Sequence, residues 1–109
     1  MEVQTSDHNG VTVFRVKGEI NLSTSPDLKR QFEKHTVRRV VVDLADVSYI
    51  DSSGLATLVE ILKKTKVHGG SLGLSGMPDK IRSLFEITKL DKLFTVYATQ
   101  ADALDAASK

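Results

Sequence analysis

Residues 40–62 read VVVDLADVSYIDSSGLATLVEIL, an apolar run followed by a polar break and then by apolar residues at helical spacing. The run over residues 40–44 is rich in β-branched side chains, which is typical of a strand covered by helices on both faces. After the break, the apolar positions from Leu55 to Leu62 fall on one stripe of a helix. The stretch therefore predicts a buried central strand, a short polar turn and an amphipathic helix.

The polar break holds the tetrapeptide Asp51-Ser52-Ser53-Gly54. Asp51 or Ser52 is a suitable N-cap for the helix that follows. One such residue is enough for a cap, and the motif supplies three. Gly54 is a poor helix former in the first turn, and we interpret it as making room for another surface to approach the serines. The motif is therefore a candidate functional site as well as a helix start.

Upstream of this stretch, the sequence predicts an antiparallel hairpin at the N-terminus. Asn9-Gly10 favours a type I′ turn, because both central positions of that turn need a positive φ. The alternating residues 11–17 form its stronger strand, which we expect Gly18 to end, and residues 2–5 form its weaker one.

A helix is then predicted over residues 26–36, with Ser25 as its cap and Pro26 in the first helical position. Downstream of the central helix, Gly69 and Gly70 supply a left-handed helix end.

The rest of the chain continues the alternation of strands and helices. The remaining predicted elements are a strand over 72–74, a helix opened by Pro78, a strand over 95–97 and a helix over 100–107. We therefore expect an α/β fold in one domain, with a mixed sheet of four to five strands and about four helices.

The amino-acid composition limits the classes of function that this protein can have. The chain has 109 residues, 40% of them hydrophobic, which suits one globular domain. A formal net charge of +1 is too small to favour a nucleic-acid partner. Basic residues gather over 29–39 and 63–66, and we interpret both groups mainly as solvated helix faces, with a docking surface as the alternative. No apolar run approaches the roughly 20 residues of a membrane span, so we expect a cytoplasmic protein with no signal peptide and no anchor.

The sequence gives little support for a metal site, a cofactor site or a catalytic site. With no cysteine, disulfides and thiolate metal sites are excluded. We expect the three histidines to be surface residues without a metal, and no glycine-rich phosphate loop is present. A nucleophilic Ser52 or Ser53 needs a base and an oxyanion hole, and neither has a sequence signature here. We therefore expect no cofactor and no enzymatic activity.

The motif suits a phosphate acceptor better. A hydroxyl at a helix start is accessible to a kinase, and a phosphate adds roughly −1.5 to −2 charges. The amides of a helix N-terminus tolerate such an anion, so the fold can stay intact while its surface changes.

Residues 40–55 closely resemble the STAS domain, the family of sulfate transporters and anti-sigma factor antagonists. Gly18-Glu19-Ile20-Asn21 is similar to the family's turn after its second strand, and residues 84–94 are similar to its late helix and the turn that follows. The resemblance covers nearly the whole chain and implies one STAS domain over residues 1–109. Asn21 stands where the family usually has an acid, so this position keeps hydrogen bonding but loses its charge.

Among STAS proteins, a chain of this length most resembles the bacterial anti-sigma factor antagonists. The resemblance implies that the unphosphorylated protein binds an anti-sigma factor that is also a serine kinase of the GHKL type, and so frees a sigma factor. It further implies that the kinase phosphorylates Ser52 and that a PP2C-type phosphatase reverses the reaction. We expect Asp43 and Asp51 to lie near Ser52, so that an added phosphate repels the partner.

We expect the partner interface to surround Ser52, in a protein that is monomeric by itself. Its expected residues are Asn21, Ser23, Thr24, Asp51, Ser53, Gly54 and Leu55. We expect residues 21–24, which include Leu22, to form a loop beside Ser52 that is part of this interface. Ser53 is either a secondary acceptor or a cap that positions its neighbour. Two alternatives with the same fold remain open: a scaffold subunit of a lipid-transport ABC ATPase complex, and a partner-switching regulator of an output other than a sigma factor.

Overall fold

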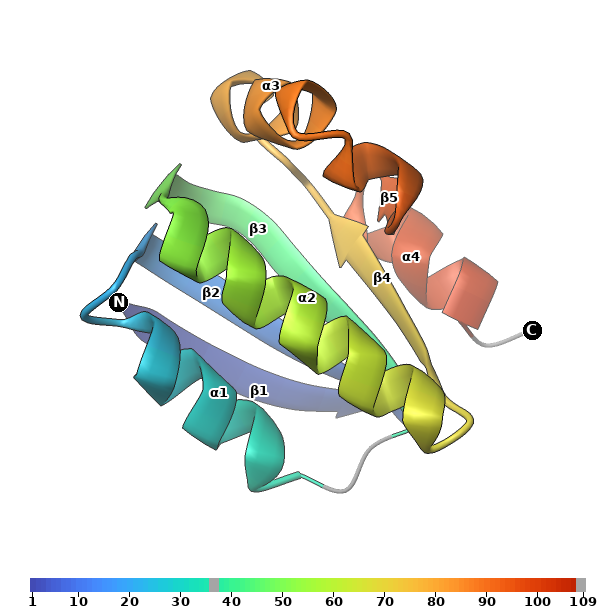
Figure 1. Ribbon diagram of the computed structural model, residues 1–109. Coiled ribbons are helices and arrows are strands. Elements are labelled where there is room, and N and C mark those ends of the chain that lie inside the picture. The colour runs from blue at the N-terminus through green and yellow to red at the C-terminus, as the bar shows by residue number, and fades with distance from the viewer. Residues whose placement is uncertain (36–37, 108–109) are drawn as a thin grey trace.

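The computed structural model describes residues 1–35 and 38–107, and it contains one five-stranded sheet (Figure 1). The strands lie in the order β1-β2-β3-β4-β5, with β1 antiparallel to β2 and the other pairs parallel. Their bounds are β1 (Glu2–His8), β2 (Val11–Ile20), β3 (Arg39–Ile50), β4 (Ser71–Ser75) and β5 (Thr95–Tyr97). The predicted mixed sheet is confirmed.

Within the described residues, four α-helices and one short 3₁₀ helix connect or follow the strands. They are α1 (Ser25–Glu33), α2 (Ser52–Val67), α3 (Asp79–Ile87), the 3₁₀ helix η1 (Leu90–Lys92) and α4 (Gln100–Ala107). The predicted order of strands and helices is confirmed, and η1 is the one element that the sequence patterns did not predict. None of the helices in the described residues is long and apolar enough to cross a membrane.

The sheet is covered on both faces, but unequally. Helices α1 and α2 lie in front of β1, β2 and β3 in Figure 1, with α3 beside the end of β4, while α4 lies behind the sheet. The main core joins the first three helices to the sheet through side chains such as Phe14, Leu44, Leu58 and Phe85. A smaller core, which includes Val41 and Ala103, holds α4 against the other face.

The central position of β3 is confirmed, since it pairs with β2 on one side and β4 on the other. The strand is longer than its β-branched run and continues without a break to Ile50. Asp43 therefore lies on the strand about 23 Å from its end at Ile50, at a rise of roughly 3.3 Å per residue. The expectation that Asp43 lies near Ser52 is wrong.

Asp43 has a structural role in the sheet. Its side chain is 7% exposed, accepts the backbone N–H of Ala45 at 2.9 Å and accepts Nε2–H of Gln100 at 2.8 Å. Because Gln100 opens α4, these bonds fix the start of that helix to the middle of β3.

The N-terminal hairpin forms as predicted, with a positive φ at both Asn9 and Gly10. The prediction that Gly18 ends the second strand is wrong. Gly18 has a φ of +100°, and the pairing of β2 with β3 shifts register next to it. A glycine at a positive φ accommodates such a bulge, so β2 continues to Ile20.

Helix α1 starts one residue earlier than predicted. Thr24 is the N-cap, and Ser25 is the first helical residue rather than the cap. The hydroxyl of Ser25 instead donates to the backbone oxygen of Asn21 at 2.6 Å. The helix ends at Glu33 instead of running to residue 36; Thr36 lies outside the described residues.

Candidate functional site

The polar break lies where β3 ends and α2 begins. Asp51 has an extended backbone, and its Oδ1 accepts the backbone N–H of Gly54 at 2.9 Å. The predicted N-cap is therefore confirmed, and it is Asp51. Ser52 is the first residue of α2.

Because Asp51 supplies the cap, the two serines are not needed for it. Ser52 is exposed and Ser53 is half-buried. The first amides of a helix have no acceptor within the helix. Within the described part of the chain, the amides of Ser52 and Ser53 have no other acceptor either. The exposed hydroxyl thus stands beside two amides that favour an anion.

The connection from β2 to α1 lies beside this helix start. The backbone N–H of Leu22 donates to Oδ2 of Asp51 at 3.1 Å, and the N–H of Asp51 donates to the backbone oxygen of Ile20 at 3.1 Å. The two carboxylate oxygens of Asp51 therefore bond to two different segments. They hold residues 20–22 and the first turn of α2 as one unit.

Asn21 organises the loop itself. Its Oδ1 accepts the backbone N–H groups of Ser23 at 3.0 Å and Thr24 at 3.1 Å. An amide oxygen satisfies these donors as a carboxylate oxygen would, so replacing the family's usual acid by Asn21 leaves the loop bonded. Thr24 adds a bond from its hydroxyl to the backbone oxygen of Glu19 at 2.8 Å.

Two residues of the expected interface have a different role. Gly54 and Leu55 are both buried. A Cβ at Gly54 would lie 2.5 Å from the backbone oxygen of Ile20 and 2.8 Å from Cγ2 of Ile50. The surface that approaches this glycine therefore belongs to the protein itself, and our interpretation of Gly54 as room for a partner is wrong.

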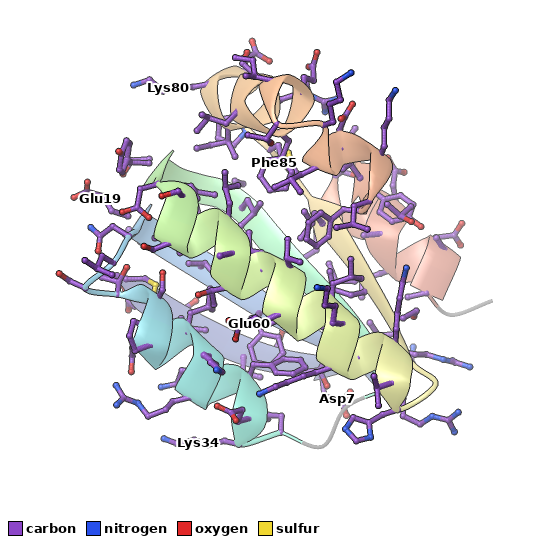
Figure 2. The ribbon with its side chains drawn as sticks, viewed as in Figure 1. Asp7, Glu19, Lys34, Glu60, Lys80 and Phe85 are labelled. Atoms are coloured by element: carbon purple, nitrogen blue, oxygen red, sulfur yellow. The ribbon has the colours of Figure 1, made fainter. Side chains whose placement is uncertain are left out.

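Two apolar residues beside the motif are exposed; Leu22 was expected in the loop next to Ser52, whereas Tyr49 was not singled out. Leu22 is 74% exposed and Tyr49 is 47% exposed. Glu19, whose Cα is the sheet partner of Tyr49, points outward at the same end of the sheet as the start of α2 (Figure 2). Tyr49 follows Ser48 at the end of the buried strand, and its residue type alone does not show that it is exposed.

Some of the basic residues of α1 and α2 form ion pairs between the two helices. Lys29 pairs with Glu60 at 3.0 Å, and Lys64 pairs with Glu33 at 3.3 Å. The hydrogen bond and charge of Glu60 raise the pKa of Lys29 above its ordinary value, and those of Lys29 lower the pKa of Glu60. These pairs agree with the interpretation of solvated helix faces.

Other candidate features lie away from Ser52. A hollow of about 580 Å³ is lined by Phe32, His35 and Arg38, among others, at the C-terminal ends of α1 and α2. We expected His35 to be a surface residue, but it is half-buried. Its ring packs edge-on against that of Phe14, with 5.4 Å between the ring centroids. Among the described residues, no three His, Asp or Glu side chains are grouped to hold a metal.

The arrangement of strands, helices and motif can be compared with known proteins. The family model described as the STAS domain matches residues 2–103. The chain belongs to the STAS domain family. The anti-sigma-B factor antagonist of Listeria monocytogenes is 34% identical over 99 residues, which cover 88% of this STAS chain and 86% of the relative.

Solved STAS structures agree with this fold. An anti-sigma factor antagonist from Mycobacterium paratuberculosis superimposes with a TM-score of 0.89 at 32% identity, covering 99% of this chain and 94% of that one. The Bacillus cell fate determinant SpoIIAA in its phosphorylated form gives a TM-score of 0.75 at 18% identity, covering 96% and 98%. The second likeness shows the fold alone.

Proposed function

We propose that this STAS protein is an anti-sigma factor antagonist whose partner binding is controlled by phosphorylation of Ser52. In its unphosphorylated form it binds an anti-sigma factor that is also a serine kinase of the GHKL type, and this releases the sigma factor. The kinase phosphorylates Ser52 and so ends the complex. A PP2C-type phosphatase removes the phosphate and restores binding.

The observation that carries this proposal is the exposed Ser52 at the start of α2, with the cap supplied by its neighbour Asp51. Ser52 is therefore dispensable for the helix and accessible to an enzyme. The anti-sigma-B factor antagonists at 34% identity support the choice of partner class. The phosphorylated state known for a protein of the same fold supports the choice of modification.

The phosphate is expected to act through charge rather than through a change of fold. Ser52 phosphate would add about two negative charges beside the carboxylate of Asp51. In a complex with a kinase, the acceptor hydroxyl must lie next to the phosphates of the bound nucleotide. A phosphoserine there faces like charges. A loss of affinity of about 10²–10³-fold corresponds to about 3–4 kcal/mol, which is reasonable for desolvating such a group.

We propose the exposed and half-buried residues around Ser52 as the interface, namely Asn21, Ser23, Thr24, Asp51 and Ser53. Gly54 and Leu55 support this surface from below. In this role the protein is a cytoplasmic monomer before it meets its partner, and it works by binding rather than by catalysis.

The experiment is a comparison of wild type, Ser52→Ala and Ser52→Asp as baits in a lysate of the native host. The bound proteins are identified by mass spectrometry, and the kinase is then purified and incubated with each variant and ATP. We expect wild type and Ser52→Ala to retain a GHKL-type kinase and Ser52→Asp to lose it. Only wild type should gain a phosphate on Ser52.

Ser83→Asp is the matched control, because Ser83 is exposed on α3, outside the proposed interface, and tests for a general effect of negative charge. Equal retention of one partner by wild type, Ser52→Ala and Ser52→Asp would contradict the proposal. If that partner were a transport ATPase, a scaffold subunit would be the better assignment.

A further inference from the structure

The described residues include five large apolar side chains that are well exposed: Leu22, Tyr49, Val67, Ile87 and Leu93. A single exposed apolar residue is ordinary in a folded protein. Leu22 and Tyr49 differ from the others because they lie on the two segments that meet at Asp51, next to Ser52. Their position, rather than their exposure alone, calls for an explanation.

The backbone at Leu22 is hydrogen-bonded although the side chain is 74% exposed. Its backbone N–H is bonded to Asp51, and the residues on either side of it are bonded to each other through the Asn21 side chain. A flexible loop would let an apolar side chain turn toward the core. Here the backbone bonds fix the position of Leu22 relative to the first turn of α2, and its side chain is exposed from that position.

Tyr49 is fixed in a different way. It lies on β3, opposite Glu19 of β2, two positions before Asp51. The sheet therefore sets its backbone position, as it does for Glu19 at the same end of the molecule (Figure 2). A tyrosine with one exposed face offers a large, stiff contact area at low cost in conformational entropy.

The charge around these residues restricts the partner. Residues 18–28 and 40–62 contain no Lys or Arg. Of their carboxylates, Asp27, Asp46 and Glu60 pair with basic side chains from outside these ranges and Asp43 is buried, which leaves Glu19 and Asp51 at the Ser52 end of the sheet. A partner surface that fits this region is apolar where it meets Leu22 and Tyr49, and is not acidic around them. An acceptor serine also has to be held still against the nucleotide, since phosphoryl transfer depends on positioning.

From these observations, we infer that Leu22 and Tyr49 are the apolar anchors that seat Ser52 in the active site of its serine kinase. The inference rests on the function proposed above and adds the residues that determine partner affinity. The kinase presents an apolar depression to Leu22, next to its nucleotide site. Because Asp51 ties Leu22 to α2, filling that depression places the Ser52 hydroxyl at a fixed position.

The test uses the purified kinase from the preceding experiment. Affinity is measured by calorimetry for wild type, Leu22→Ser and Tyr49→Ser, and the rate of Ser52 phosphorylation is measured against antagonist concentration. We expect each substitution to weaken binding about tenfold or more, as for the central residues of an interface, and to raise KM more than it lowers kcat. Val67→Ser is the control, because Val67 is 82% exposed at the far end of α2.

The outcomes distinguish a failure of the anchor role of Leu22 and Tyr49 from a failure of the proposed function. Thermal unfolding of Leu22→Ser should match that of wild type, which keeps a misfolded variant from imitating the effect. Suppose that wild type binds the kinase and is phosphorylated, and that Leu22→Ser and Tyr49→Ser have the same affinity and phosphorylation rate. The inference that these residues are anchors is then wrong, and the proposed function stands. If wild type binds no kinase, the result contradicts both the proposed function and the inference about Leu22 and Tyr49. If wild type is a dimer in sedimentation and Leu22→Ser is a monomer, the surface at Leu22 binds a second copy and the kinase assignment is overturned.

Discussion

Asp51 and Leu22, far apart in the sequence, are joined by a hydrogen bond of 3.1 Å from the backbone N–H of Leu22 to Oδ2 of Asp51. The other oxygen of the same carboxylate caps α2 at Gly54. One side chain thus fixes both the helix that carries Ser52 and the loop beside it. This arrangement lets an exposed serine keep a defined position without taking part in the fold.

The first prediction concerns this double role of Asp51. Asp51→Ala removes the cap and the loop bond together and should lower the free energy of unfolding by about 0.5–2 kcal/mol. Asp51→Asn retains one acceptor oxygen, so it can satisfy Gly54 or Leu22 but not both, and should fall between alanine and wild type. Urea unfolding measures the free energy, and amide exchange at Leu22 reports the loop. Unchanged exchange at Leu22 in Asp51→Ala would show that the loop does not depend on this bond.

The second prediction concerns Gly54. A Cβ at this position would lie 2.5 Å from the backbone oxygen of Ile20, and a strand carbonyl cannot move aside as a flexible side chain would. Gly54→Ala should therefore destabilise the protein by about 1–3 kcal/mol, although alanine is the better helix former. Thermal unfolding measures the effect. Ser53→Ala, in the same turn but half-buried, is the control and should cost much less; a Gly54→Ala variant as stable as wild type would contradict the packing argument.

The third prediction concerns the attachment of α4. Gln100→Ala leaves Oδ2 of Asp43 buried without its 2.8 Å hydrogen bond, and the loss of a bond to a buried carboxylate typically costs about 1.5–3 kcal/mol. We expect amide exchange to rise in α4 before it rises in α1 or α2. The neighbouring exposed Ala101→Ser serves as the control. A uniform rise across all helices would indicate that α4 is not a separately opening element.

The sequence predicted the element order because its periodicities are strong and its turn residues are specific. Asn9-Gly10, the β-branched run and the cap at Asp51 each act locally, so local patterns were sufficient. The errors at Gly18, Ser25 and Asp43 share another cause. A bulge, a hydrogen bond from Ser25 to Asn21 and a strand that continues past its β-branched run all depend on partners distant in the sequence or on backbone geometry.

The candidate site likewise has features that the local sequence predicts and features that depend on residues distant in the sequence. Residue type and order within the motif predicted a cap at Asp51 or Ser52 and an accessible serine, and the choice of Ser52 over Ser53 as the acceptor came from the family resemblance. Gly54 was correctly singled out, but its reason was not, because the atoms that crowd it come from Ile20 and Ile50. Leu22 was expected in the loop beside Ser52, but its exposure could not be predicted, and neither could the backbone bond to Asp51 that fixes its position.

The fourth prediction concerns pH. The folded-state pKa of Glu60 is lowered by Lys29, so the pair stabilises the fold above the ordinary Glu pKa of 4.5 and loses this effect as the pH falls through the lowered value. Glu60→Gln should therefore be less stable than wild type near neutral pH, and the difference should disappear in acid. Urea unfolding of both proteins across this range measures it. Glu86→Gln, exposed on α3, is the control; a difference for Glu60→Gln that persists at low pH would mean that the loss is not electrostatic.

The last prediction separates the two ways in which a charge at Ser52 can act. If phosphorylation worked by unfolding the start of α2, Ser52→Asp would destabilise the protein. The structure argues otherwise, because Ser52 is exposed, Asp51 makes the cap, and a negative charge in the first turn interacts favourably with the helix dipole by about 0.3–1 kcal/mol. Repulsion from the adjacent Asp51 carboxylate opposes this gain. We therefore expect the free energy of unfolding of Ser52→Asp to lie within about 0.5 kcal/mol of wild type, as for ordinary surface substitutions, while kinase binding is lost. Urea unfolding and calorimetric binding on the same samples test both halves. A variant that loses binding and stability together would assign the switch to the fold, whereas loss of binding alone assigns it to the surface charge at Ser52.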